Sequence, residues 1–178
     1  MSFRDVQNRL RAVIEGRGAD GSLGAAAQTR ACTIDRFRTT DTPDLSTLDA
    51  QAIDRACNVS LSAVSDTIPR NVHCNERNVT ATLDVRVSYV AAPALWELVH
   101  GEDDATAQQE AAADWAPRAL DDAREIERAL TWYELTGDDT SPVIESVRPI
   151  GDVTLNDLGN GRGLMTRRFE LLLEDTQP

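Results

Sequence analysis

The chain has 178 residues and a mass of 19.5 kDa, a length that fits a single domain spanning residues 1–178. Acidic residues outnumber basic ones by 30 to 18, and the resulting net charge of −12 argues against sequence-specific recognition of DNA or RNA through phosphate contacts. All 18 basic residues are arginine, which excludes chemistry that needs a lysine, such as Schiff-base formation or a Walker A phosphate loop.

The N-terminal segment and the cysteines predict a soluble protein that is made and kept in a cytoplasm, or that is assembled there into a larger particle. Residues 2–10 carry charges throughout and lack the apolar stretch of a secretory signal. No apolar run approaches the length of a membrane-spanning helix. The cysteines, Cys32, Cys57 and Cys74, are odd in number and widely spaced, so we expect reduced thiols in or near the core.

Residues 2–15 predict an amphipathic helix, because apolar side chains recur there at steps of three and four. These side chains are Phe3, Val6, Leu10, Val13 and Ile14. Residues 16–30 then predict a glycine-rich loop. Gly16, Gly18 and Gly21 have the spacing G-x-G-x-x-G, but a dinucleotide site needs a strand before the glycines, and here a helix precedes them. We therefore interpret the segment as a flexible connection.

Short strands and loops are expected in the next part of the chain. Residues 30–38 have enough β-branched and aromatic character for a short strand, and residues 49–56 predict a helical turn or a loop. Residues 57–64 alternate between apolar and polar side chains, which predicts a half-buried strand. The face predicted to be buried carries Cys57, Val59, Leu61 and Ala63. Residues 65–77 predict a polar loop.

The strongest strand signal lies at residues 78–91, where strict alternation predicts one buried face and one wet face. The buried face is expected to carry Val79, Ala81, Leu83, Val85, Val87 and Tyr89. Pro93 is expected to end this strand, because proline lacks the N–H that a ladder hydrogen bond needs.

Residues 102–133 have a helical composition, and residues 100–115 are predicted to form an acidic helical insert. Pro117 marks either a kink or the first residue (N1) of a new helix, with Asp114 nearby. The predicted apolar stripe consists of Ala119, Leu120, Ala123, Ile126, Leu130 and Tyr133. The predicted solvated side consists of Asp121, Asp122, Glu125, Glu127 and Arg128.

The C-terminal part predicts a β-hairpin. Residues 143–155 form the first strand, in which Pro149 and Gly151 indicate a bulge or a break. The turn at residues 160–163 begins with Asn-Gly, a strong hairpin signal, and the return strand follows it. Taken together, the elements predict an α+β fold: a small, mostly antiparallel sheet packed by an N-terminal helix and a central helix, with a C-terminal β-hairpin.

A few residues have side chains that could form a chemical site. His73 and Cys74 are adjacent, and adjacent side chains rarely face each other as a catalytic dyad must. Zinc binding by Cys32, Cys57, His73 and Cys74 would lack the closely spaced cysteine pairs of structural zinc sites.

The paired carboxylates Asp103–Asp104 and Asp138–Asp139 lack the calcium-loop pattern, and we interpret them as solvated acids beside a helix. Three familiar catalytic signatures, G-x-S-x-G, H-E-x-x-H and S-x-x-K, do not occur. We therefore expect no catalytic, cofactor-binding or metal-binding residues, and we expect that the protein is not an enzyme.

Three segments in the second half of the chain stand out by their order. Residues 77–89 read RNVTATLDVRVSY, residues 123–130 read AREIERAL, and residues 161–173 read GRGLMTRRFELLL. This order resembles tail terminator and related neck proteins, which join heads to tails in long-tailed bacteriophages. In that family a strand ending in an aromatic residue precedes a helix of the form x-x-I-x-x-A-L, and an apolar strand closes the chain. The resemblance covers residues 50–175 and is one of element order; the insert at residues 100–115 departs from it.

The resemblance implies a small antiparallel sheet packed by helices and assembled into a six-fold ring. Such a ring caps the tail tube, stops its polymerisation and presents a surface to the head connector or stopper protein. DNA passes through the lumen without sequence-specific contact, and no membrane or cofactor takes part. Arg162, Arg167 and Arg168 could pair with acidic residues across a subunit boundary, and solvent exposure of these arginines is the simpler alternative.

Three hypotheses follow from the sequence. The first is a structural virion protein, assembled in the host cytoplasm and located in the neck or tail, either as a tail terminator or as another neck component such as a stopper or head completion protein. The second is a non-viral cytoplasmic binding module. The third is an enzyme that uses His73 or the acidic loops, which the scarcity of histidine and the missing nucleophile motifs disfavour.

Overall fold

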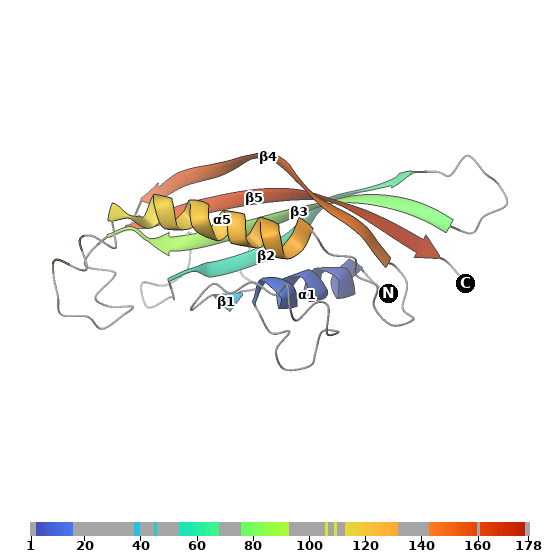
Figure 1. Ribbon diagram of the computed structural model, residues 1–178, viewed down its shortest axis with the longest axis horizontal. Coiled ribbons are helices and arrows are strands. Elements are labelled where there is room, and N and C mark those ends of the chain that lie inside the picture. Colours follow the sequence, from blue (N-terminus) through green and yellow to red (C-terminus); the bar gives the residue numbers. More distant parts are fainter. Residues whose placement is uncertain are drawn as a thin grey trace.

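In the part of the chain that the structure describes, a twisted five-stranded sheet carries two helices, α1 and α5, as predicted for the α+β class (Figure 1). The computed structural model describes residues 3–15, 38–39, 45, 54–67, 76–92, 106, 109, 113–131, 143–159 and 161–176. In chain order the elements are α1 (Phe3–Ile14), β1 (Arg38–Thr39), β2 (Ala56–Thr67), β3 (Glu76–Val90), α5 (Trp115–Thr131), β4 (Val143–Gly159) and β5 (Arg162–Thr176).

The strand order is β1-β2-β3-β5-β4, so the strand that comes last along the chain lies inside the sheet. The four long strands are antiparallel neighbours, as the sequence predicted, whereas β1 runs parallel to β2 and pairs with only two of its residues. β3 and β5 pair over their whole lengths, from Glu76 opposite Thr176 to Val90 opposite Arg162. α5 lies over β4, β5 and β3, whereas α1 packs against β2 and α5.

Both helices contribute to one hydrophobic core on one face of the sheet (Figure 1). α1 buries Val6, Leu10, Val13 and Ile14, which confirms its predicted stripe apart from Phe3, whose side chain is 43% exposed. The side-chain amide of Gln7 donates a 2.7 Å hydrogen bond to the carbonyl of Val59, which attaches α1 to β2. The predicted buried face of β3, from Val79 to Tyr89, is also confirmed.

β2 and β3 are longer than the sequence predicted, because the strands continue into the expected polar loop as far as Thr67 and start again at Glu76. A register shift between Leu61 and Ala63 changes which side chains face the core. Ala63 lies opposite Thr82 and is exposed, so its predicted place on the buried face is wrong. Val64 takes the position opposite the buried Ala81 instead.

β4 is an edge strand with three register irregularities along its pairing with β5. Pro149 lies within it, which is tolerated because an edge strand needs hydrogen bonds on one side only. The largest irregularity separates Ile150 from Thr154 and contains Gly151 with φ +64°, so the predicted interruption is a bulge and the strand does not end there. The hairpin turn is tighter than predicted, since Gly159 already pairs with Arg162.

Pro117 is the third residue of α5, so the predicted N1 position is wrong by two residues, although the proline does lie in the first turn of a helix. A proline is tolerated in the first turn because the N–H groups there have no intrahelical acceptor. The carbonyl of Asp114 accepts the first helical hydrogen bond, from the N–H of Arg118 at 3.1 Å. Two predicted positions are wrong: Leu120 is 42% exposed, and Asp122 is buried among the apolar side chains.

Several predictions lie outside the described residues. These are the glycine-rich loop at residues 16–30, most of the short strand at 30–38, most of the acidic insert at 100–115, and Tyr133.

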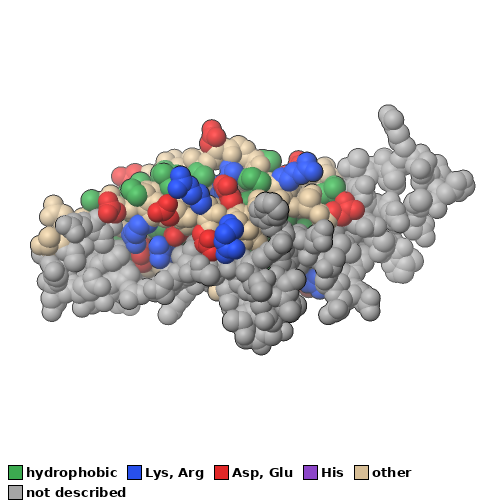
Figure 2. Space-filling view, in the orientation of Figure 1, with side chains coloured by type: hydrophobic (Ala, Val, Ile, Leu, Met, Phe, Trp, Pro, Cys, Tyr) green, Lys and Arg blue, Asp and Glu red, His purple; other side chains and the backbone are tan. Residues whose placement is uncertain are grey.

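No helix in the described part of the chain is long and apolar enough to cross a membrane. On the face shown in Figure 2, acidic and basic side chains of the described residues are interleaved instead of segregated by sign.

Candidate functional site

The predicted chemical candidates fall mostly outside the described residues. This holds for His73 and Cys74, for Cys32, for the aspartate pairs at 103–104 and 138–139, and for the three glycines of the G-x-G-x-x-G spacing. Cys57 is described, and it is a buried thiol in β2 that contributes to the core, as predicted. Within the described residues, no three His, Cys, Asp or Glu side chains gather as metal ligands would.

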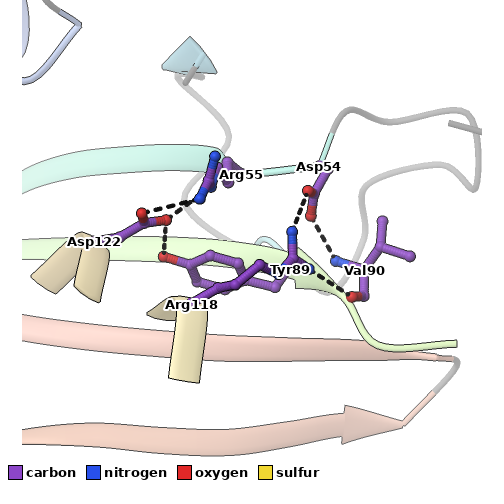
Figure 3. A network of polar contacts seen from close by, with 6 residues as sticks. All are labelled: Asp54, Arg55, Tyr89, Val90, Arg118 and Asp122. Atoms are coloured by element: carbon purple, nitrogen blue, oxygen red, sulfur yellow. Dashed lines mark hydrogen bonds and ion pairs between the residues drawn. The ribbon is translucent and has the colours of Figure 1, made fainter. Parts of the chain in front are cut away.

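The most concentrated polar chemistry lies where the turn before β2, the end of β3 and the first half of α5 meet (Figure 3). Six residues take part, and we call them the junction network: Asp54, Arg55, Tyr89, Val90, Arg118 and Asp122. Their side chains and backbone groups point toward one another, which identifies the network as the best-defined polar site of the described chain.

Asp122 is the first centre of the junction network. Arg55 approaches its carboxylate with two nitrogens, Nε at 2.8 Å from Oδ2 and Nη2 at 3.1 Å from Oδ1. The hydroxyl of Tyr89 donates to Oδ2 at 2.9 Å. Burial raises the pKa of Asp122, and the Arg55 guanidinium and the Tyr89 hydroxyl act in the opposite direction. Burial and the Asp122 charge raise the pKa of Tyr89 well above its ordinary value, so the phenol keeps its proton and remains a donor.

Asp54 is the second centre. Its carboxylate accepts the backbone N–H of Val90 at 2.9 Å and Nη1 of Arg118 at 3.0 Å. Arg118 also donates to the carbonyl of Val90 at 3.4 Å, and its guanidinium lies 6.0 Å from the centre of the Tyr89 ring. The last backbone groups of β3 are therefore satisfied by a turn and a helix after the strand ladder ends.

The backbone at Arg55 is unusual, with φ at +60°, a region that residues with a Cβ rarely occupy. Such a conformation is stable only where interactions with the surrounding structure outweigh its local energetic cost. Here the two sides of the turn are each held by an ion pair to α5, Asp54 to Arg118 and Arg55 to Asp122. The junction network thus fixes both the entry of the chain into β2 and the position of α5.

The aromatic side of the junction depends on a glycine. The rings of Tyr89 and Trp115 lie 6.3 Å apart at 34°. Gly163 of β5 lies directly under Trp115, and a Cβ at this position would collide with the indole ring. Sequence reasoning placed Gly163 in the hairpin turn, but it belongs to β5 and lacks the positive φ of Gly159 and Gly161. Its function is to let the indole approach the sheet.

The three arginines of β5 were predicted either to reach across a subunit boundary or to be exposed. Arg162 is buried instead, donates a 3.1 Å hydrogen bond to the Ser88 hydroxyl, and has its pKa lowered by burial. Arg167 is also buried and pairs with Glu127 of α5 at 2.6 Å. Both predictions are therefore wrong for these two residues, because the interactions form within one chain. Arg168 has an exposed side chain and pairs with Asp84 at 3.3 Å.

Arg167 also stabilises the bulge of β4. It donates to the carbonyl of Ile150 at 3.3 Å and to that of Gly151. Its guanidinium lies 5.8 Å from the centre of the Phe169 ring. The carbonyls that the bulge removes from the ladder therefore gain a charged donor, which compensates for the lost pairing.

On the opposite face of the sheet, the bulge borders a shallow pocket of about 380 Å³. It is lined by Ile150, Gly151, Asp152, Thr154, Thr166 and Arg168. The carboxylate of Asp84 beside it contacts both Arg86 and Arg168 at 3.3 Å. The lining combines one cation, one acid and two hydroxyls, so it has no strong preference for either sign of charge.

The carboxylates of the junction network are all committed to arginine, hydroxyl or backbone donors. The phenol of Tyr89 is likewise directed into the protein, toward Asp122. The network therefore acts by holding a turn, a strand end and a helix together.

The sequence matches none of the known family models and none of the curated proteins with which it was compared.

Proposed function

We propose that this chain is a structural virion protein of a long-tailed bacteriophage, a tail terminator whose copies form a ring on the tail tube. The supporting observation is the arrangement of elements. An N-terminal helix and a central helix pack on one face of an antiparallel sheet that ends in a hairpin, and this is the fold that the resemblance to tail terminator and neck proteins implies.

The face of the sheet opposite the helices is compatible with this proposal. Part of this face is open: β3 and β5 carry side chains there that are partly or largely exposed, among them Thr80, Thr82, Thr166 and Glu170. The rest is closed, since Asp84, Ser88 and Arg162 on the same face are buried. A ring needs two different surfaces on each copy, and this polar face and the outer side of α5 provide two. Proposed partners are further copies of the chain in a six-fold ring, the tail tube protein, and the head connector or stopper protein. The proposed location is the neck or tail of the virion, after assembly in the host cytoplasm.

The junction network contributes rigidity to such an assembly. A ring that fits onto a tube tolerates little movement between its sheet and its helices. Two partly buried ion pairs hold α5 to the turn before β2, and the buried Tyr89 holds α5 to β3. The proposed function therefore depends on shape and contact surfaces.

Electron microscopy of the purified full-length protein, alone and mixed with the tail tube protein of the same virus, tests the proposal. We expect class averages of six-fold rings and tubes that stop elongating when the ring is bound. A protein that stays a monomer and forms no ring with the tube protein would contradict the proposal and favour a binding module. Rings that bind the head connector but not the tube would assign it to another neck position.

A further inference from the structure

A buried arginine holds the β4 bulge in place. The register of β4 jumps from Ile150 to Thr154 opposite β5, so the residues between them have no partner in the ladder. Arg167 holds their backbone from the core side through the carbonyls of Ile150 and Gly151, and Glu127 of α5 pairs with its guanidinium. Bulges re-aim side chains and are frequent beside functional sites. On the outer face of the sheet, this bulge forms one wall of the shallow pocket of about 380 Å³.

A second buried side chain holds the cation of this pocket. Asp84 is almost fully buried, and its Oδ1 lies 3.3 Å from Nε of Arg168. The two Nη atoms of Arg168 contact no acceptor in the described chain, and its side chain is 62% exposed. Arg168 is therefore anchored at one nitrogen and keeps unused donors for a ligand.

The other polar groups of the pocket are two hydroxyls and a carboxylate. Thr154 and Thr166 are paired across β4 and β5, so their side chains lie next to each other on the outer face. Asp152 belongs to the unpaired part of the bulge, and within the described chain it forms no ion pair with Arg168 or with another arginine. A cationic and an anionic group thus line one pocket without neutralising each other.

We propose that this pocket binds a small zwitterion of dipeptide size, with its carboxylate on Arg168 and its ammonium group on Asp152. A purely anionic ligand is opposed by Asp152 and a purely cationic one by Arg168, whereas a ligand with both charges gains from both residues. Because the two residues do not pair with each other, the charges of the ligand must also lie apart, as they do at the ends of a dipeptide. The peptide group is then available to the two threonine hydroxyls.

The size of the pocket agrees with such a ligand, since about 380 Å³ lies at the lower end of the range for small-molecule sites. Both charged side chains are exposed, so water screens each contact, and we expect a dissociation constant on the order of 1 mM. The inference goes beyond the proposed function and does not depend on it, because every group of the pocket comes from one chain.

Saturation-transfer NMR on the full-length protein, a measurement suited to weak ligands, tests the pocket with glycylglycine as the probe. N-acetylglycine is the matched anion, because it keeps the peptide group and the carboxylate but lacks the ammonium group. Glycylglycinamide is the matched cation, because it keeps the ammonium group and lacks the carboxylate. We expect glycylglycine to bind at least about threefold more tightly than either of them.

Two variants remove the charges of the pocket, and a third removes a charge outside it. Arg168→Gln and Asp152→Asn are each expected to weaken glycylglycine binding at least about threefold. Arg148→Gln removes another exposed arginine of the outer face that does not line the pocket, and it should bind as the wild type does. Circular dichroism checks the fold of each variant, and if Arg168→Gln is unfolded, Asp152→Asn decides.

The proposal is overturned if glycylglycine gives no signal at about 10 mM, ten times the expected dissociation constant. It is also overturned if either matched ion binds as tightly as glycylglycine, or if Arg148→Gln loses as much affinity as the pocket variants do. Rings seen by electron microscopy together with absent glycylglycine binding would refute the pocket alone. Binding without rings would refute the proposed function alone.

Discussion

The hydroxyl of Tyr89 lies 2.9 Å from Oδ2 of Asp122 and donates a hydrogen bond to it. Tyr89 is at the end of β3 and Asp122 is in the second turn of α5, and both side chains are almost fully buried. A buried phenol needs an acceptor, and a buried carboxylate needs several donors. The contact therefore fixes the rotation and height of α5 on the sheet more strictly than apolar packing alone would.

Asp122→Ala is expected to destabilise the protein by about 3 kcal/mol, because it leaves the Tyr89 hydroxyl and the Arg55 guanidinium without their acceptor. Urea unfolding followed by circular dichroism measures the loss. The neighbouring Asp121→Ala is the matched control: its carboxylate is 77% exposed and contacts an exposed Arg124 at 3.6 Å, so we expect a change below about 0.5 kcal/mol. Equal losses would contradict a special role for Asp122.

Asp122 is also expected to make stability depend on pH. Burial raises its pKa above the ordinary value of 3.8 in spite of Arg55, so the folded state holds this proton more tightly than the unfolded chain does. The stabilisation from this group is complete below pH 3.8 and is lost as the pH rises through the raised pKa.

Asp122→Asn cannot titrate at this position, so the free energy of unfolding of wild type minus that of Asp122→Asn isolates the effect. We expect this difference to decrease as the pH increases from about 4 to about 7. An increase over the same range would mean that Arg55 lowers the pKa of Asp122 more than burial raises it.

The backbone of Arg55 predicts an inverted preference between glycine and alanine. Arg55→Gly and Arg55→Ala both lose the ion pair to Asp122, but only glycine accepts a φ of +60° without strain. We expect Arg55→Gly to be more stable than Arg55→Ala by about 1 kcal/mol in thermal or urea unfolding. At Arg128, within α5, the order should reverse, with alanine better than glycine by about 1 kcal/mol. The same order at both sites would contradict the strained turn.

Gly163→Ala is expected to cost about 2 kcal/mol, because the added methyl group meets the Trp115 ring. The tryptophan fluorescence of the folded protein should change with it. The control is the same substitution in a Trp115→Leu background, where the smaller side chain leaves room and the cost should decrease. A cost that is unaffected by the background would place the strain in the β5 backbone instead.

The helix α1, the alternation of β3 and the C-terminal hairpin could be predicted from sequence because their signals are local. Apolar spacing over a dozen residues determines which side of a helix or strand is buried. The shift in β2 could not be predicted, since no glycine or proline marks it. It moved Ala63 to the exposed face and brought Val64 opposite Ala81.

The junction network was missed for a different reason. Its ion pairs join residues 64 and 67 positions apart, and nothing near Asp54 or Arg55 in sequence indicates a partner on α5. One signal was present: Asp122 lies three residues after Ala119 and four before Ile126, so it falls within the apolar stripe. An acidic residue at such a position predicts a buried partner. Asp122 was predicted on the solvent-exposed side of the helix because of its charge alone.

The place of β5 between β3 and β4 has a consequence for folding during synthesis. This interior strand is synthesised after the other four strands. During synthesis, the edge of β3 that pairs with β5 therefore stays unpaired until β5 has left the ribosome. Contacts between residues as distant as Glu76 and Thr176 close late, which raises the contact order and slows folding. Nascent chains are therefore most exposed to chaperones, proteases and aggregation in the interval before β5 emerges.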